Sequence, residues 1–356
     1  MLHTAGDMWQ RFKKNADKDS RSGLSIDDSR VAFARVQRLN SGKLQLAALT
    51  FDGAGIDEKW AHQLASRMDN IDPARSQVTS VLPDGSYQLL LIDIPNVPAD
   101  EINSAARWQI KDLLDFPVDD TVVELFEMPQ VSAGEKKAMA YAVATRRSSI
   151  QEHIELLHGA GFSLNVIDIP ELCTRNIATL LPQDADGVAF LHFTETHGML
   201  TVTRQGVLYL IRRIEKGRAA ITSASTDTVA GTGSDTVPML EIPVLEVQGS
   251  SDDESQSAAT DDFIRTETEN TIVLEIQRSL DYYESHFFGR PLTELVLAPG
   301  SDIGGLSKSL SEQLGLTVSS LDFHKLFEMQ SELMPAEQGA CLLAVGAALR
   351  SESLAA

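Results

Sequence analysis

A three-strand pattern that occurs twice constrains the fold of this chain more than any other feature. In residues 187–217 an apolar run is followed by a polar turn with Gly198, an alternating run, a Gln205-Gly206 turn and a third run. Alternation between such turns is typical of antiparallel strands. The predicted strands are 188–193, 199–203 and 207–214, and the same layout near the N-terminus predicts strands 24–27, 31–39 and 44–51. Because each pattern opens one half of the chain, the sequence predicts a duplicated architecture.

Strands alternate with helices after the first pattern, which predicts an α/β layer. A hairpin is expected around Asp84-Gly85, because this dipeptide favours a tight turn. An amphipathic helix is expected to begin near Pro98 and to end before Pro117. The other expected elements are the hairpin strands 78–82 and 87–94, strands 121–126, 138–145 and 162–169, and helices near 56–68, 148–157 and 173–181.

An acidic segment of different composition follows the second pattern. Residues 222–262 are rich in Ser, Thr, Asp, Ala and Gly, so they bury too little apolar surface to offset chain entropy, and we predict a disordered insertion. Its apolar stretch 238–247 is either a strand or docking motif for an exposed sheet edge, or simply a solvated stretch. The expected elements beyond it are a helix from about Phe263, strands 295–298 and 317–321, a Gly300 turn followed by a helix, and a closing helix 340–350.

Charge and composition restrict the partners and the compartment. The formal net charge is −21, which argues against a nucleic-acid partner because phosphate binding needs clustered Lys and Arg. Cys173 and Cys341 lie far apart in sequence, which fits a reducing compartment. No apolar run reaches the roughly 18 residues that span a bilayer, so we expect a cytoplasmic protein. The basic residues 1–21 are interpreted as a flexible leader, with peripheral membrane contact through 8–21 as the alternative.

Short motifs spread along the chain occur in a recognisable order. They are Ile94-Pro95 with Pro98 and Glu101, Leu114-Asp115-Phe116-Pro117, Gly161-Phe162 with Ile167-Asp168-Ile169, residues 274–283, and residues 344–350. In this order they resemble the PilM family of type IV pilus assembly proteins, and most of all its MshI branch from the mannose-sensitive haemagglutinin (MSHA) system. The resemblance covers nearly the whole chain from Ser22.

The resemblance implies an α/β protein with the actin-like ATPase fold of the FtsA and PilM type. Two duplicated βββαβα halves would enclose a nucleotide cleft, with an inserted αβ subdomain in the first half. On this basis the chain divides into a leader (1–21), a first half (22–185) with the inserted subdomain at about 56–147, a second half (186–350) that carries the acidic insertion, and a tail (351–356).

A nucleotide site of this kind needs a carboxylate that holds Mg²⁺, small residues beside the phosphates and often a cation. The resemblance places Ser25 where the family has Asp, Asp27 where it has Gly, and Ala32 where it has Lys. In the second pattern, His192-Phe193-Thr194 replaces an acidic-x-Gly sequence. Strand, glycine turn and helix at Gly300 form a geometry that can present backbone N–H groups to a phosphate or an adenine ring.

We therefore predict a vestigial nucleotide cleft and no catalytic residue. Its candidate residues are Asp27, Ser29, Thr194, Arg278, Gly300 and Ser301. No cofactor or metal is expected, and weak binding of ATP with Mg²⁺ through a register-shifted Asp27 or Asp28 is the alternative.

The resemblance implies a scaffold at the inner membrane that binds the cytoplasmic segment of a bitopic partner of the PilN or MshJ type. Such an extended segment would pair through main-chain hydrogen bonds, which leave few marks in the sequence. Two other hypotheses are an active actin-like ATPase of the same machine and the cytoplasmic domain of a secretion-platform protein resembling GspL.

Overall fold

The computed structural model describes residues 20–27, 30–52, 77–129, 138–222, 253–287, 291–329 and 332–350. The predicted leader as far as residue 19, the helix near 56–68 and the apolar stretch 238–247 lie outside these described residues. Within them, no helix combines the length and the apolar character needed to cross a lipid bilayer.

The first sheet begins with the predicted meander. Strands β1 (Ser20–Ile26), β2 (Arg30–Arg38) and β3 (Leu44–Asp52) pair antiparallel in sequence order. β4 (Gln77–Val81) then pairs parallel to β1, and β8 (Ser163–Asp168) pairs parallel to β4. Together with β14 (Phe327–Met329), which pairs with β3 at the opposite edge, the strand order is β14-β3-β2-β1-β4-β8.

The second sheet repeats this arrangement. Its antiparallel strands are β9 (Val188–Phe193), β10 (Gly198–Arg204) and β11 (Val207–Ile214), and its parallel strands are β12 (Glu294–Leu297) and β13 (Thr317–Ser320). The order β11-β10-β9-β12-β13 matches β3-β2-β1-β4-β8 strand for strand. The predicted duplication is therefore confirmed.

A smaller antiparallel sheet forms the inserted subdomain. β7 (Met139–Arg146) lies between β5 (Tyr87–Asp93) and β6 (Thr121–Glu127), so β5 and β6 are edge strands. Helix α3 (Ile102–Gln109) packs Ala106 and the adjacent Ile110 against Ile92 and Ala142 on one face of this sheet. The three-residue 3₁₀ helices η1 (Ala99–Glu101), η2 (Lys111–Leu113) and η3 (Val118–Asp120) complete the subdomain.

The predicted hairpin around Asp84-Gly85 is wrong. β4 joins the first sheet and β5 joins the inserted sheet, so the two strands do not pair with each other. Local turn chemistry favours a hairpin, but Val78 and Val81 are at most 1% exposed between two parallel neighbours. Burial in the first sheet therefore overrides the local signal.

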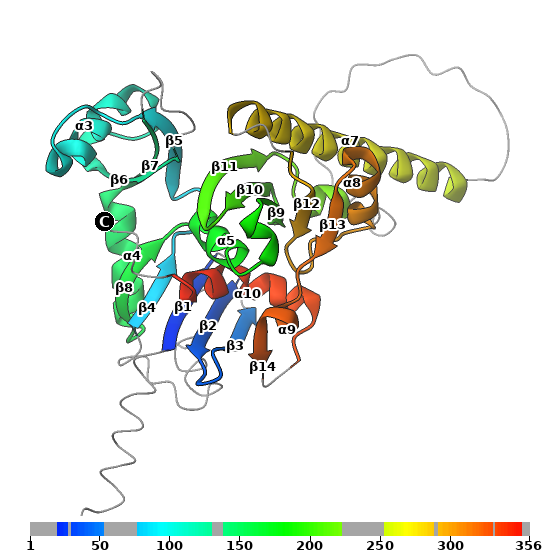
Figure 1. The fold of residues 1–356 in the computed structure, drawn as a ribbon, viewed down its shortest axis with the longest axis horizontal. Helices are drawn as coiled ribbons and strands as arrows, with labels where there is room; N and C mark the ends of the chain where they lie inside the picture. Colours follow the sequence, from blue (N-terminus) through cyan, green and yellow to red (C-terminus); the bar gives the residue numbers. More distant parts are fainter. Residues whose placement is uncertain are drawn as a thin grey trace, which may run out of the picture.

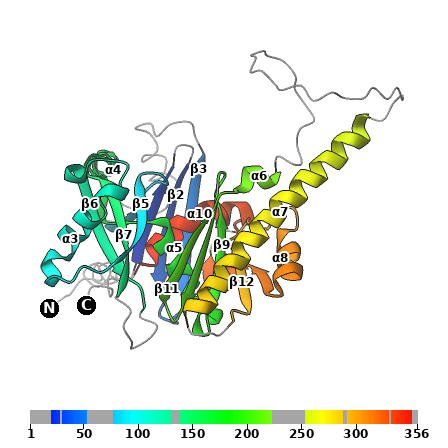
Figure 2. The ribbon, with the colours of Figure 1, turned by 90° about the horizontal axis from the view of Figure 1, so that it is seen from above.

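Each large sheet is covered by a helix from the other half. α5 (Pro170–Ala178) follows β8 yet packs against β9, β10 and β11, whereas the terminal helix α10 (Pro335–Ala348) packs against β1, β2 and β3. Figure 2 shows α10 between the two large sheets. One core contains Ala34 of β2, Val188 of β9 and Leu342 of α10, so the halves share their interior.

Two glycines allow the close packing of α10. A Cβ atom at Gly346 would lie 2.3 Å from the carbonyl oxygen of Cys173 in α5, and a Cβ atom at Gly23 would lie 2.0 Å from that of Ala344. The Asn176 side chain also donates from Nδ2 to Gly346 O at 2.9 Å. Backbone therefore meets backbone where α5, α10 and β1 cross.

The outer face of the second sheet is covered by α7 (Asp253–His286), the long helix in Figure 1. Its buried stripe contains Ile272, Ile276 and Tyr283. The prediction of disorder through residue 262 is wrong in part, because α7 begins at Asp253. The prediction used composition alone. It therefore did not include residues 253–262, which continue a helix whose later part packs into the core.

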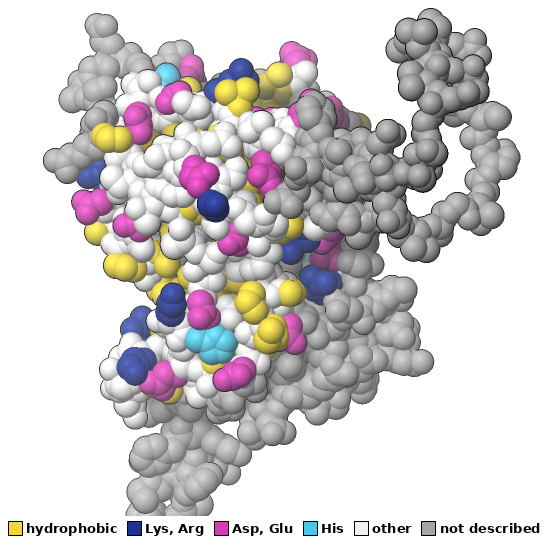
Figure 3. Space-filling view, turned by 90° about the vertical axis from the view of Figure 1, so that its right-hand side faces the viewer, with side chains coloured by type: hydrophobic (Ala, Val, Ile, Leu, Met, Phe, Trp, Pro, Cys, Tyr) yellow, Lys and Arg dark blue, Asp and Glu magenta, His cyan; other side chains and the backbone are white. Residues whose placement is uncertain are grey.

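The remaining helices lie between these elements along the chain. They are α4 (Arg147–Gly159), η4 (Pro182–Ala185), α6 (Arg218–Thr222), α8 (Leu306–Leu314) and α9 (Phe323–Leu326). On the face seen in Figure 3, hydrophobic side chains of the described residues form small separate groups among acidic and basic ones.

Candidate functional site

The turn between β9 and β10 is closed by its own hydrogen bonds. The Thr194 N–H donates to His197 O at 2.8 Å, and the His197 N–H donates to Thr194 Oγ1 at 3.1 Å. Gly217 packs so tightly against the turn that a Cβ atom there would lie 2.3 Å from His197 N and 2.5 Å from Glu195 O. Two amide groups of this turn are therefore used within the turn itself.

Arg218 links this turn to the Gly300 loop. The backbone N–H of Arg218 donates to Thr194 O at 2.8 Å, and Nη1 of its side chain donates to Gly300 O, also at 2.8 Å. Gly300 has φ +69°, and a Cβ atom there would lie 3.0 Å from Pro335 O, so the start of α10 covers one side of the loop. The structure thus brings together Thr194 and Gly300 through an arginine that the sequence analysis did not single out.

Two buried polar side chains near this linkage lack a hydrogen-bond partner among the described residues. They are Nδ1 of His192, which is 8% exposed, and Oγ of Ser301, which is fully buried. The pKa of His192 is lowered to about 4, chiefly by burial and also by the charges of the nearby Arg218 and His197. A neutral imidazole therefore occupies the position where the resemblance expects an acidic residue.

Three described positions near this linkage differ from what the family resemblance expects at a nucleotide site. Ala32 is 2% exposed in the core, where the family resemblance expects a lysine. The ring of Phe193 lies against Gly198, where a Cβ atom would approach it to 2.7 Å. Within the described part of the chain, no group of three or more His, Cys, Asp or Glu is placed to hold a metal ion.

The other predicted site residues lie on different elements. Asp27 is exposed at the end of β1, and its N–H donates to Arg30 O at 3.0 Å. Arg278 is exposed on α7. Ser29 lies outside the described residues. No sequence signal marks Arg218 beyond a single basic residue after Gly217.

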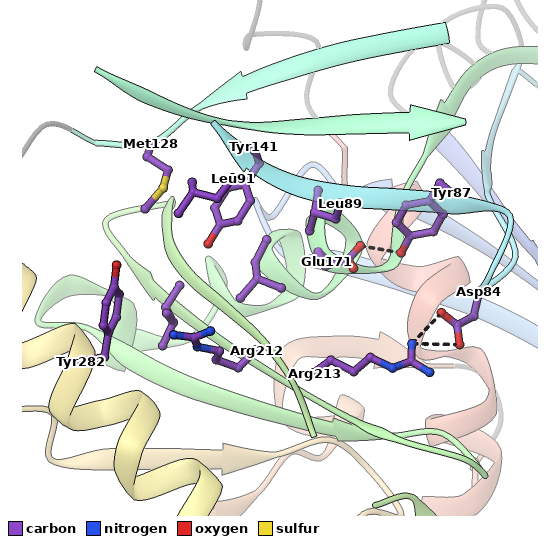
Figure 4. Close-up of a pocket in the computed structure, with 12 residues that line it drawn as sticks. Asp84, Tyr87, Leu89, Leu91, Met128, Tyr141, Glu171, Arg212, Arg213 and Tyr282 are labelled. Atoms are coloured by element: carbon purple, nitrogen blue, oxygen red, sulfur yellow. Dashed lines mark hydrogen bonds and ion pairs between the residues drawn. The ribbon is translucent and has the colours of Figure 1, made fainter. Parts of the chain in front are cut away.

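A groove of about 400 Å³ lies between the inserted sheet and the second half (Figure 4). This volume is within the range of small ligand sites. One wall belongs to β5 and β7, on the face opposite α3, and the other wall belongs to β11 and α7. Its lining residues are Asp84, Tyr87, Leu89, Leu91, Met128, Tyr141, Glu171, Leu210, Ile211, Arg212, Arg213 and Tyr282. The sequence analysis predicted none of them as a site residue.

Asp84 connects one end of the groove to the β9–β10 turn. Its Oδ1 lies 3.1 Å from Nη1 of Arg213, and its Oδ2 lies 3.4 Å from Nδ1 of His197. Asp84 belongs to the segment that joins β4 of the first sheet to β5 of the inserted sheet. The connection between these sheets is thus attached to the second half.

A buried carboxylate lies at the same end of the groove. Glu171 is 8% exposed, and its Oε2 accepts a hydrogen bond from the Tyr87 hydroxyl at 2.8 Å. Burial raises the pKa of Glu171, and the charges of Asp84 and Asp168 raise it further, against the opposing effect of its hydrogen bonds. In the described part of the chain, no Lys or Arg forms an ion pair with Glu171.

Comparison of sequences found no matching family model and no matching curated protein. Solved structures do match. The PilM–PilN type IV pilus biogenesis complex matches with a TM-score of 0.66 and 16% identity, over 92% of this chain and 97% of the other. A Bacteroides thetaiotaomicron protein with an actin-like ATPase fold and unknown function matches with a TM-score of 0.44 and 10% identity. This match covers 92% of this chain and 97% of the other.

A third similar structure is the cytoplasmic domain of EpsL, an inner-membrane component of the type II secretion system of Vibrio cholerae. It has a TM-score of 0.38 and 12% identity, over 68% of this chain and 94% of that chain.

This chain has an actin-like ATPase fold. The match to PilM–PilN includes nearly the whole length of both chains, and the two large sheets share one strand order. The predicted fold class is confirmed.

Proposed function

We propose that this actin-like protein is a scaffold component of a type IV pilus biogenesis machine, at the cytoplasmic face of the inner membrane. Its partner in this proposal is the cytoplasmic segment of a bitopic inner-membrane protein of the PilN or MshJ type. The finer assignment is to the MSHA system, where the protein takes the place of MshI. Nucleotide hydrolysis has no part in the proposed function.

The observation that carries the proposal is a groove lined by both apolar and charged side chains, close to a β9–β10 turn whose amide groups are already hydrogen-bonded. Hydrogen bonds of Thr194 and Arg218 occupy the β9–β10 turn, and His192 supplies no negative charge for a metal. The groove exposes Leu91, whose side chain is 41% accessible. The likeness to the PilM–PilN complex supports a partner of the PilN type.

The first expected result concerns this partner. The full-length protein should bind a synthetic peptide that corresponds to the cytoplasmic N-terminal segment of the PilN-like protein from the same organism. We expect a Kd on the order of 10 μM, because a short segment ordered on binding gains about 7 kcal/mol at most from such a groove. Isothermal titration calorimetry measures the affinity, and a scrambled peptide of identical composition is the control. Equal binding of both peptides contradicts the proposal.

The second expected result concerns ATP. With Mg²⁺ present, phosphate release should stay at the rate of the buffer, because the described cleft lacks the carboxylates and the open turn that phosphoryl transfer requires. A coupled phosphate assay measures this rate, with Asp27→Ala as the comparison. Turnover by the wild-type protein that disappears in Asp27→Ala would show an active ATPase.

A further inference from the structure

We propose that copies of this chain associate head to tail, with the leader segment 8–14 of one copy bound to the outer face of α3 in a second copy. The α3 face is formed by Asp100, Glu101, Trp108, Asp112 and Leu113. The inference goes beyond the proposed function and does not depend on it. Three observations carry it: an exposed tryptophan, acidic side chains near it, and a leader of complementary chemistry.

The first observation is the apolar centre of the α3 face. Ala106 and the adjacent Ile110 are buried against the inserted sheet. Successive residues of an α-helix lie about 100° apart around its axis, so Trp108, midway between these two, points away from that sheet. Trp108 is 53% exposed, and Leu113 in η2 is 59% exposed. Because tryptophan often forms the energetic centre of protein interfaces, this exposed ring indicates a contact surface.

The α3 face is separate from the groove. The groove is lined by the opposite face of the inserted sheet, through Leu89 and Tyr141. Figures 1 and 2 both show α3 on the outer side of the inserted subdomain, away from the second half. A molecule bound in the groove therefore does not cover Trp108.

The second observation is the negative charge of the inserted subdomain. Residues 84–127 contain ten Asp or Glu, and their two Lys or Arg are Arg107 and Lys111. Such an excess of one sign attracts a segment of the opposite sign and disfavours an acidic one. The charge therefore selects a basic occupant for the α3 face.

Three of these carboxylates lie on the α3 face. Asp100 and Glu101 are exposed just before α3, and Asp112 is exposed just after it. α3 has eight residues, so it is about 12 Å long and the carboxylates lie on both sides of Trp108. Among the described residues, none of the three forms an ion pair. A basic segment with aromatic side chains can pair with these carboxylates and cover the indole ring.

The third observation is the leader itself. Residues 8–14 read Met-Trp-Gln-Arg-Phe-Lys-Lys, with three basic side chains, the rings of Trp9 and Phe12, and no acidic residue. They precede β1 and lie outside the described residues. The formal net charge of the whole chain is −21, so a basic segment of this kind contrasts with the rest of the sequence. Leader segment and α3 face match in both charge and apolar character.

The leader of the same copy is too short to reach the α3 face. Phe12 is eight residues before Ser20, where β1 begins, so the chain between them spans at most about 28 Å. Figure 1 shows the start of β1 and α3 at opposite ends of the first half. The leader would need about 20 Å to pass the seven residues of β1, and the remainder does not cover the inserted sheet. The occupant is therefore the leader of a second copy.

Two variants of the full-length protein and their mixture test the inference by sedimentation equilibrium. Trp9→Ala alters only the leader, and Trp108→Ala alters only the α3 face. The wild type should associate with a Kd on the order of 50 μM, and each variant alone at least about tenfold more weakly. An equimolar mixture should form one-to-one dimers with nearly the wild-type affinity, because one variant keeps the α3 face and the other keeps the leader.

The control for these measurements is Leu274→Ala. Leu274 is 46% exposed on α7 in the second half. Its replacement removes an exposed apolar side chain outside the α3 face, so it should change the association less than about twofold. Circular dichroism melting of each variant verifies that it is folded.

A fluorescein-labelled peptide of residues 1–19 tests the charge pairing, with full-length Trp9→Ala as the receptor. Glutamate at positions 11, 13 and 14 of the peptide should weaken binding at least about tenfold. In the receptor, lysine at positions 100, 101 and 112 should reverse this preference, so that the glutamate peptide binds more tightly than the native one. If this receptor does not fold, Leu113→Ser in its place should weaken binding of the native peptide at least about fivefold.

Each outcome supports or overturns a named part of the inference. A wild type that stays monomeric at 200 μM and binds no peptide overturns all of it. Equal peptide binding by receptors with and without Trp108→Ala overturns the α3 face. A mixture that stays monomeric while the wild type associates overturns the exchange of leaders between copies. If the peptide instead binds vesicles that contain phosphatidylglycerol and binds no receptor, the leader contacts lipid and the inference is overturned.

Discussion

Replacement of Gly346 by alanine should destabilise the protein by about 3 kcal/mol, at the upper end of the usual cost of overpacking a core. The added methyl group would lie 2.3 Å from Cys173 O and 2.6 Å from Cys173 C, both backbone atoms of α5. No side-chain rotation relieves such a contact, so α5 and α10 must separate and weaken the Asn176–Gly346 hydrogen bond. Chemical denaturation monitored by circular dichroism measures the change in unfolding free energy.

A matched control uses a glycine in an open place. Gly159 is the last residue of α4, and beyond its chain neighbours and the backbone of its own helix no described heavy atom lies within 4 Å of the Cβ position. Gly159→Ala should change the stability by less than about 0.5 kcal/mol, whereas Gly23→Ala should repeat the loss on the other side of α10. Similar stabilities for Gly346→Ala and Gly159→Ala would contradict the close helix crossing.

A fall in pH from about 6.5 to 4 should remove about 3 kcal/mol of stability through His192 alone. The pKa of His192 is lowered from 6.5 to about 4, chiefly by burial. Below pH 6.5 the unfolded chain takes up a proton that the folded protein still excludes, so stability is full above this pH and decreases as the pH falls. The lowered pKa values of the buried His153 and His197 act in the same direction.

The effect of Glu171 on the pH dependence of stability is opposite to that of His192. Its raised pKa means that the folded protein keeps a proton that the unfolded chain has lost, so this group reduces stability as the pH rises above about 4.5. Denaturation curves of the wild type, His192→Gln and the exposed His158→Gln, measured between pH 4 and 7, separate these effects. His192→Gln should reduce the loss of unfolding free energy between pH 6.5 and 4, and His158→Gln should leave this loss unchanged. The same loss in all three proteins would refute the role of His192.

Much of the fold follows from local patterns. The two meanders were predictable because apolar or alternating runs are separated by turns that carry a glycine or a polar residue, as at Gly42 and Gly206. The β4–β5 hairpin was mispredicted because a turn signal does not report which strands become neighbours. That choice depends on burial between β1 and β8, which lie far from β4 in sequence.

The sites were less predictable than the fold. The absence of an acidic residue at His192 could be deduced from the family resemblance, but Arg218 could not, since its importance arises from contacts with Thr194 and with Gly300, which is 82 residues away. The groove combines side chains from β5, α5, β11 and α7. No single stretch of sequence contains enough of them to form a motif.

The exchange of α5 and α10 between the halves has a consequence for biosynthesis. All strands of the first sheet except β14 are synthesised before the second half of the chain. The helix that covers this sheet, α10, emerges from the ribosome only with residues 335–348. Until then the sheet's apolar face at Ala32, Ala34 and Leu46 has no permanent cover. We therefore expect nascent chains that stop before α10 to leave this apolar face exposed, as a surface that chaperones and proteases can recognise.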